Sequence, residues 1–322
     1  MSTLNKTLFA IFALQLAILG ATQFAGSDRL AVQRVDLFPG LEAEKVSRID
    51  ISGPSGETKE QVVLARKGED WVVDSAEGYP AKASDVEDLL SKLAKLVSRN
   101  VVLESSRYHE KLEVTDDAHQ RKVILTVGGE PRTFFLGSSP KFKNTHVRFE
   151  AEDQVVLAPV STSDFGNRAW NWVERSYVEI PKNDVWRIEM QNEKGSVVLE
   201  RDPASGAWSS PDIPDLAQSE VDTLLGKLTS VRLEEPVGKT EAPEYGLSAP
   251  VATVALTVGT STSTGLPPLE TKKRTLRVGA SAEGKSQRFV KFDDETFIVR
   301  VSNTNLSPIL EKGPEDFASS EN

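Results

Sequence analysis

The sequence predicts an α+β protein: two tandem copies of one domain, each a mostly antiparallel sheet with one packed amphipathic helix, after an N-terminal transmembrane helix. Two observations predict this. Residues 84–97 and 219–231 share one helical pattern of apolar side chains, and the segments around them follow in the same order. An uncharged apolar stretch near the N-terminus predicts the membrane helix.

Both predicted helices have one apolar face and a serine near their start. In the second helix the apolar residues recur at the spacing of one buried face: Val221, Leu224, Leu225 and Leu228. The first helix repeats that spacing with Val86, Leu89, Leu90, Leu93, Leu96 and Val97. Ser84 with Glu87 predicts a capping box, and Ser219 predicts an N-cap.

Alternating apolar and polar residues predict the strands of each half. The first half has such segments at 46–51, 61–66, 71–73, 100–104, 122–127, 132–136, 146–149 and 154–157. The second half has them at 185–190, 196–201, 251–258, 274–278, 288–292 and 296–301. Trp71 and Trp208 are 137 residues apart, as are Tyr108 and Tyr245. This steady offset predicts an internal duplication.

Residues 8–24 carry no charge and reach the lower limit of length for a membrane-spanning helix. A cleaved signal peptide is the alternative interpretation of this segment. Because Lys6 precedes the segment, the positive-inside rule places the N-terminus in the cytoplasm. The predicted location is therefore the bacterial inner membrane, crossed once, with the following domains in the periplasm.

These observations divide the chain into five parts. Residues 1–26 form the anchor or signal segment, and 27–45, with a Pro-Gly pair, form a stalk. Residues 46–182 make the first repeat and 183–312 the second. Residues 313–322 are a polar C-terminal tail.

Composition narrows the possible functions. The net charge of −10 argues against nucleic acid as a partner, because phosphate binding needs a basic face. The chain has no cysteine, which excludes disulfides, thiolate metal sites and cysteine nucleophiles. His109, His119 and His146 lack the spacing of metal ligands, and we expect them on the surface. We predict no cofactor, no metal and no enzymatic activity.

Residues 279–286 match the phosphate-loop pattern G-x-x-x-x-G-K-S. A phosphate loop needs a helix directly after it, but residues 287–292 alternate like a strand. We therefore expect a hairpin turn here. The acidic clusters at 116–117 and 293–295 could bind a hard cation, although aspartate is also typical of turns, which we favour.

Two groups of residues are candidate interaction sites. Basic side chains that could meet lipid headgroups, an anionic glycan or an acidic partner are Lys141, Lys143, Arg148, Lys272, Lys273 and Arg274. Solvated hairpins are the alternative interpretation of that group. Trp170 and Trp172 lie where the first repeat passes into the second. They could form a carbohydrate platform or a protein contact, but packing between the two domains is the favoured interpretation.

Several of these features resemble the family catalogued as domain of unknown function 4340. They are the N-terminal apolar segment, the Leu-Phe-Pro-Gly-Leu sequence at 37–41, Trp71 and Trp208, and the Glu-Tyr-Gly-Leu-Ser-Ala-Pro sequence at 244–250. The first repeat lacks the glycine and proline of that last motif. Members of this family are often found beside ABC-type transport components, which implies an accessory role at the cell envelope.

The expected function is therefore that of a non-enzymatic, membrane-anchored, periplasmic scaffolding subunit of an envelope complex with an ABC-type transporter. The alternative is a binding module for cell-wall glycan or lipid that uses the tryptophans or the basic hairpins. An enzyme with a site assembled from distant residues is the third possibility.

Overall fold

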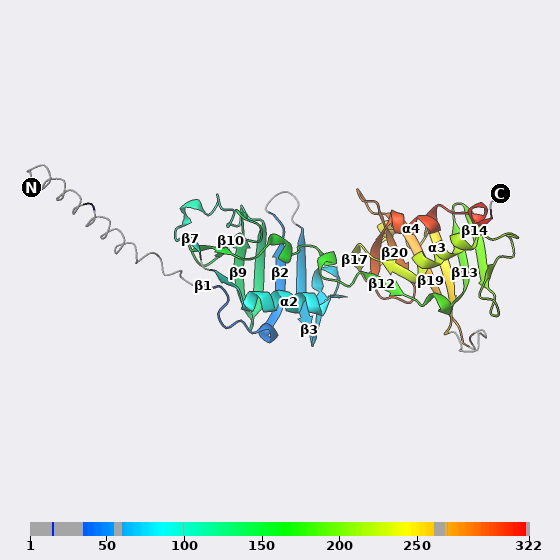
Figure 1. Ribbon diagram of the computed structural model, residues 1–322, viewed down its shortest axis with the longest axis horizontal. Helices are drawn as coiled ribbons and strands as arrows, with labels where there is room; N and C mark the ends of the chain where they lie inside the picture. Colours follow the sequence, from blue (N-terminus) through cyan, green and yellow to red (C-terminus); the bar gives the residue numbers. More distant parts are fainter. Residues whose placement is uncertain are drawn as a thin grey trace, which may run out of the picture.

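The computed structural model describes residues 15, 35–54, 60–98, 100–260, 268 and 270–319. These residues form two large sheets arranged one after the other along the molecule (Figure 1). The predicted membrane segment 8–24 lies outside the described residues, apart from Gln15. None of the helices in the described part of the chain has the length and apolarity that a membrane crossing requires.

The first repeat is a nine-stranded antiparallel sheet with strand order β5-β4-β3-β2-β8-β9-β10-β11-β7. Its strands are β2 (Val46–Ser52), β3 (Gln61–Lys67), β4 (Asp70–Val73), β5 (Tyr79–Pro80), β7 (Val101–Leu103), β8 (Arg121–Val127), β9 (Glu130–Leu136), β10 (Thr145–Phe149) and β11 (Val155–Ala158). Helix α2 (Ala83–Ala94) follows β5. The strands predicted for this half are thereby confirmed.

The second repeat is an eight-stranded antiparallel sheet with strand order β15-β14-β13-β18-β19-β20-β21-β17. Its strands are β13 (Val185–Asn192), β14 (Gly195–Arg201), β15 (Trp208–Ser209), β17 (Glu235–Gly238), β18 (Ala252–Val258), β19 (Lys272–Ser281), β20 (Gln287–Phe292) and β21 (Ile298–Ser302). Its helices are α3 (Gln218–Thr229) and α4 (Asn303–Leu310). The order of pairing repeats that of the first sheet.

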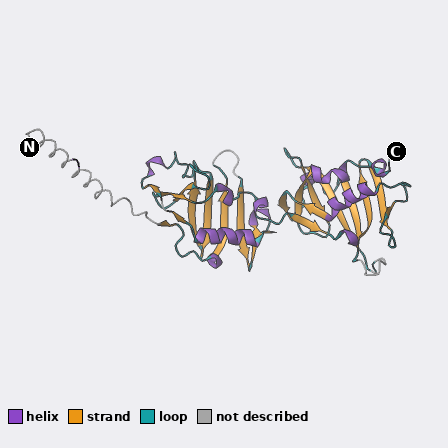
Figure 2. Ribbon diagram, viewed as in Figure 1, coloured by secondary structure: helices purple, strands orange, loops and turns teal. Residues whose placement is uncertain are grey.

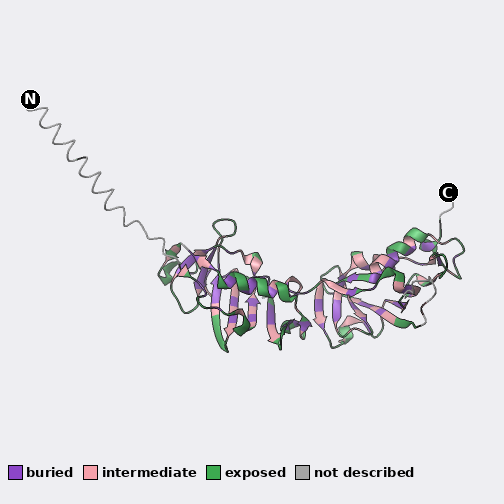
Figure 3. Ribbon diagram, turned by 60° about the horizontal axis from the view of Figure 1, so that its bottom comes forward, coloured by how far each residue is buried: buried purple, intermediate pink, exposed green. Residues whose placement is uncertain are grey.

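The helices of each repeat pack on one face of its sheet (Figure 2). The side chains of α2 that face the sheet are Val86, Leu89, Leu90 and Leu93, and those of α3 include Val221, Leu224, Leu225 and Leu228. Figure 3 shows that the opposite side of each helix is exposed. The predicted apolar faces are therefore core, and most of the buried apolar side chains form one connected cluster through both repeats.

The predicted helix caps are wrong. Both α2 and α3 begin one residue before the expected cap, so Ser84 and Ser219 lie inside the first turn. The residues at the N-cap positions are Lys82 and Ala217, and neither uses its side chain to cap the helix.

Tertiary hydrogen bonds place these helix starts. The Lys82 amide donates to the Trp172 carbonyl at 2.6 Å, and the Ala217 amide donates to the Phe317 carbonyl at 2.8 Å. In both repeats a segment from the end of the repeat therefore holds the start of its helix. Trp172 and Phe317 occupy corresponding positions.

Each repeat also begins with a short strand that pairs with the strand after its helix. β1 (Val35–Asp36) pairs with β6 (Val97–Ser98), and β12 (Ser176–Glu179) pairs with β16 (Ser230–Arg232). β1 lies in the segment 27–45 that we expected to be a stalk. At the C-terminus, the 3-10 helix η8 (Pro314–Phe317) lies in the expected polar tail, yet its Phe317 is fully buried.

The Glu-Tyr-Gly-Leu segment has a structural counterpart in the first repeat. A Cβ on Gly137 would lie 2.0 Å from the Leu112 carbonyl oxygen, and a Cβ on Gly279 would lie 2.0 Å from the Tyr245 carbonyl oxygen. Only glycine fits this close approach. The residue after each carbonyl is left-handed, with φ of 59° in the first repeat and 64° in the second.

This correspondence changes the alignment of the two repeats. Tyr245 matches Leu112, not Tyr108 as the constant offset predicts. Glu113 takes the left-handed conformation for which the second repeat has Gly246. The first repeat keeps the shape of the motif without its glycine, so sequence comparison alone misaligns this segment.

The two repeats are joined head to tail. β17, at one edge of the second sheet, lies against the 3-10 helices η2 (Asp74–Ala76) and η5 (Ala169–Asn171) of the first repeat. The corresponding edge of the first sheet is β7, at the opposite end of the molecule (Figure 1). The contact is heterologous, because different edges of the duplicated unit meet.

Candidate functional site

The junction between the repeats is formed by side chains that the sequence did not single out. The ring of Tyr79 packs edge-to-face on Phe297 with a centroid separation of 4.8 Å. The Lys239 amide donates to the Glu77 carboxylate at 2.6 Å, and the Lys239 ammonium lies 4.9 Å from the centroid of the Phe297 ring. Gly238 has φ of 154°, a conformation that residues with a side chain rarely adopt, so glycine is favoured there.

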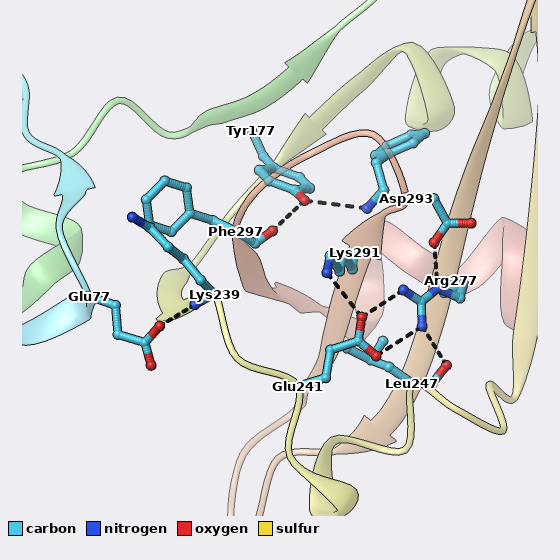
Figure 4. Close-up of polar contacts among 10 residues, drawn as sticks. Glu77, Tyr177, Lys239, Glu241, Leu247, Arg277, Lys291, Asp293 and Phe297 are labelled. Atoms are coloured by element: carbon cyan, nitrogen blue, oxygen red, sulfur yellow. Dashed lines mark hydrogen bonds and ion pairs between the residues drawn. The ribbon is translucent and has the colours of Figure 1, made fainter.

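Tyr177 continues this contact into the second repeat. Its hydroxyl donates to the Phe297 carbonyl at 2.7 Å and accepts from the Phe292 amide at 3.3 Å (Figure 4). Burial raises the pKa of Tyr79 to about 12 and raises that of Tyr177 as well. The raised pKa values extend the pH range over which both hydroxyls are neutral, because burial disfavours the charged form of each.

A charged network fixes the loop that follows β17. Glu241 accepts from Arg277 at 2.8 Å and from Lys291 at 3.0 Å (Figure 4). Arg277 also donates to the Leu247 carbonyl at 2.8 Å and to Asp293 at 2.6 Å. These hydrogen bonds lower the pKa of Glu241 to about 2. The network ties the loop to the open face of the sheet.

A cleft of about 260 Å³ lies beside the junction. It is lined from both repeats, by Glu60, Gln61, Ser75, Ala76, Asn167, Arg168, Ala169, Glu235, Pro236 and Lys285. Arg168 pairs with Glu60 at 2.5 Å, while Lys285 lies 3.7 Å from Glu235. Charges of both signs are thus paired in the cleft, which favours a structural role for these residues.

The tryptophans of the 165–172 segment have different environments. Trp172 is buried, and its indole donates to the Gly166 carbonyl at 2.7 Å, so it belongs to the core of the first repeat. Trp170 is half-buried, with the Arg175 guanidinium 4.4 Å from its ring centroid. Since one face of Trp170 is covered and Trp172 is buried, the two rings do not form an open platform.

Arg148 and the second basic group are engaged with the protein itself. Arg148 is buried and donates to four backbone carbonyls, those of Val114, Phe149, Glu150 and Glu152. In the second group, Lys272 and Arg274 bind Asp294, Arg274 also binds Glu295, and Lys273 binds Glu189. These pairs neutralise Asp294 and Glu295, and Asp293 pairs with Arg277.

Lys141 and Lys143 are different, because both ammonium groups are exposed. Among the described residues, no carboxylate lies within ion-pair distance of either one. Between them Phe142 is 87% exposed. Of the predicted basic residues, these two remain on the surface without a partner of opposite charge in the described part of the chain.

The three histidines are buried side chains, and the phosphate-loop pattern lies in a hairpin. The expectation that the histidines lie on the surface is wrong: His109, His119 and His146 are all buried, and each contacts a carbonyl or hydroxyl oxygen. Burial lowers the pKa of His146. Residues 279–281 end β19 and residues 282–286 connect it to the antiparallel strand β20, which confirms the predicted hairpin. The described residues contain no group of metal ligands.

The family model described as domain of unknown function (DUF4340) matches residues 71–250 and, a second time, residues 208–321. The chain belongs to this family. The two matches begin at Trp71 and Trp208, the tryptophans that the sequence pairs as equivalent, and together they support an internal duplication. No curated protein and no solved structure matches the chain.

Sequence reasoning missed Tyr79, Phe297 and Phe142. Tyr79 and Phe297 contact each other across more than 200 positions of sequence, so no local pattern marks them. Phe142 had a signal, because an apolar residue between two lysines in a predicted loop lacks a core to enter.

Proposed function

We propose that this chain is a non-enzymatic, membrane-anchored accessory subunit that holds the proteins of an envelope complex on the periplasmic side of the inner membrane. The apolar segment 8–24 supports the anchor. The resemblance described above supports an ABC-type transporter as the partner.

The observation that carries the proposal is the packed junction between the repeats. Tyr79 against Phe297 and Glu77 against the Lys239 amide join two duplicated units into one elongated body. A fixed arrangement of two sheets presents surfaces at set distances from one another, which a scaffold requires. The aromatic and polar groups named here all contact the other repeat, so none of them is a free reactive group.

A lipid-binding module is the second candidate, and one observation favours it. Phe142 is exposed between Lys141 and Lys143, whose charges are unpaired within the described residues. A glycan platform has less support, because Trp172 is buried and one face of Trp170 carries Arg175.

The test is recovery of partners from gently solubilised membranes with an affinity tag on the full chain. We expect transporter subunits in stoichiometric amount. The matched variant is Tyr79→Ser with Phe297→Ser, which separates the repeats and should reduce recovery, while Glu244→Gln, on an exposed side chain, should not. Loss of the transporter subunits, with retention of the chain on purified cell wall or lipid, would contradict the scaffold.

A further inference from the structure

The loop tip formed by Lys141, Phe142 and Lys143 is the most exposed apolar feature among the described residues. Phe142 is 87% exposed, compared with 47% for Tyr108 and 41% for Val102. The Lys143 ammonium lies 5.5 Å from the centroid of the Phe142 ring. An aromatic ring between two cations is suited to the boundary between lipid headgroups and acyl chains.

The loop tip is held in a defined shape. The Asn144 amide donates to the Lys141 carbonyl at 3.1 Å, and the Asn144 side chain donates to the Phe142 carbonyl at 3.2 Å. Lys143 is left-handed, with φ of 55°, which for a residue with a side chain costs about 1 kcal/mol. The turn therefore holds Phe142 in solvent. Because the loop tip is already ordered, binding through it costs little conformational entropy.

The loop tip lies at the end of the first repeat where the chain arrives from its N-terminus. Val35 pairs with Ser98, the Ser98 hydroxyl donates to the Leu157 carbonyl at 3.0 Å, and Leu157 pairs with His146. His146 follows the loop directly. Two strand pairings and one side-chain hydrogen bond therefore link Val35 to the strand that follows this loop. Figure 1 shows β1, β7 and β10 together at the end opposite the second repeat.

The short stretch of chain before β1 limits how far the loop tip can lie from the predicted membrane segment. Only residues 25–34 separate the apolar segment from β1, a length of at most ~36 Å when fully extended. The β7 edge of the first sheet therefore stays close to the bilayer, if residues 8–24 cross it. The second repeat is attached at the β5 edge, on the far side of the same sheet.

We propose that the loop tip contacts an anionic lipid surface, with Phe142 at the headgroup boundary and the two lysines on lipid phosphates. This contact rests on the proposed membrane anchor and deepens it. It sets the first repeat on the bilayer and directs the second repeat away from the membrane. The neighbouring segment carries exposed Glu104 and Glu110 beside exposed Arg107 and Lys111, so it adds no net positive charge to that of the loop tip.

The second repeat supplies a built-in control. Its corresponding turn carries Glu283, Gly284 and Lys285 between β19 and β20, and no aromatic residue. Lys285 lies 3.7 Å from Glu235, so its charge is already partnered. This turn is on the part of the molecule that the proposal places away from lipid.

The chain lacks cysteine, so single cysteines can report on these two turns in the full-length protein. We would attach an environment-sensitive fluorophore at Phe142→Cys or at Glu283→Cys and reconstitute each protein into vesicles. The vesicles contain phosphatidylcholine alone or phosphatidylcholine with phosphatidylglycerol. The expected result is a blue shift at position 142 that requires phosphatidylglycerol, and no shift at position 283.

Charge removal tests the lysines. Lys141→Ala with Lys143→Ala should lower the ratio of lipid-contacting to free loop tips by about 30-fold, since each lysine near an anionic surface adds to binding.

Vesicle flotation separates the proposed membrane anchor from the proposed loop-tip contact. Protein that does not float with vesicles overturns both the anchor and this contact. Protein that floats while position 142 remains in water overturns the contact alone.

Discussion

The ring of Tyr79 in the first repeat meets the ring of Phe297 in the second edge-to-face, with centroids 4.8 Å apart. These two residues are 218 positions apart in the sequence. Their contact joins the two sheets at unlike edges, so that the duplicated units form a directional chain instead of a symmetric pair.

The first prediction concerns this contact. A double-mutant cycle with Tyr79→Leu and Phe297→Leu should give a coupling energy of about 1 kcal/mol in urea unfolding, the usual value for an edge-to-face pair. The same cycle with Tyr79→Leu and Phe289→Leu is the control, because Phe289 stacks on Tyr245 within the second repeat. Additive effects in the Tyr79–Phe297 cycle would contradict a packed junction.

The second prediction separates backbone strain from crowding. Gly246 and Gly284 have φ of 64° and 65°, yet a Cβ on Gly246 would lie 2.9 Å from the Ala280 amide nitrogen, whereas Gly284 has open space. Gly284→Ala should lower the free energy of unfolding by about 1 kcal/mol, the cost of the left-handed conformation. Gly246→Ala should cost clearly more. Equal losses in denaturant unfolding would mean that the loop moves to accept the methyl group.

The third prediction is a pH dependence. Hydrogen bonds from Arg277 and Lys291 hold the pKa of Glu241 at about 2, below its ordinary value of 4.5. A carboxyl with a lowered folded-state pKa stabilises the protein above the unfolded value, and this stabilisation is lost as the pH falls from about 4.5 to about 2. Because the side chain is 34% exposed, solvent screening limits the effect to about 1 kcal/mol.

Glu241→Gln should therefore lower the free energy of unfolding at pH 7, and its difference from wild type should shrink as the pH falls through that window. Urea unfolding across the pH range measures both. Glu244→Gln, at an exposed position on the same loop, is the control. A difference between wild type and Glu241→Gln that stays constant down to the acid limit would rule out this ion pair as its source.

The fourth prediction distinguishes Arg148 from Lys143, two basic residues that look alike in the sequence. Arg148→Met removes a buried guanidinium from four carbonyl oxygens and should cost about 2–4 kcal/mol, since unsatisfied buried acceptors are expensive. Lys143→Ala changes an exposed side chain and should leave thermal unfolding nearly unchanged. A stable Arg148→Met protein would show that water replaces the guanidinium.

Local periodicity determined most of the secondary structure and the duplication. The apolar faces around Leu90 and Leu225, the hairpins and the paired tryptophans Trp71 and Trp208 could all be predicted, because each depends on residues close in sequence or on simple self-similarity. The hairpin at 279–286 could be predicted for the same reason: a strand pattern follows the loop where a phosphate site needs a helix.

Tertiary structure alone decided where α2 and α3 start, the burial of Arg148 and the three histidines, and the junction of the repeats. Lys82 and Ala217 begin their helices because distant carbonyls, those of Trp172 and Phe317, accept their amides. Such hydrogen bonds satisfy buried polar groups and outweigh a local serine cap. The Tyr79–Phe297 contact forms because two sheet edges meet in space, and no spacing along the chain encodes that meeting.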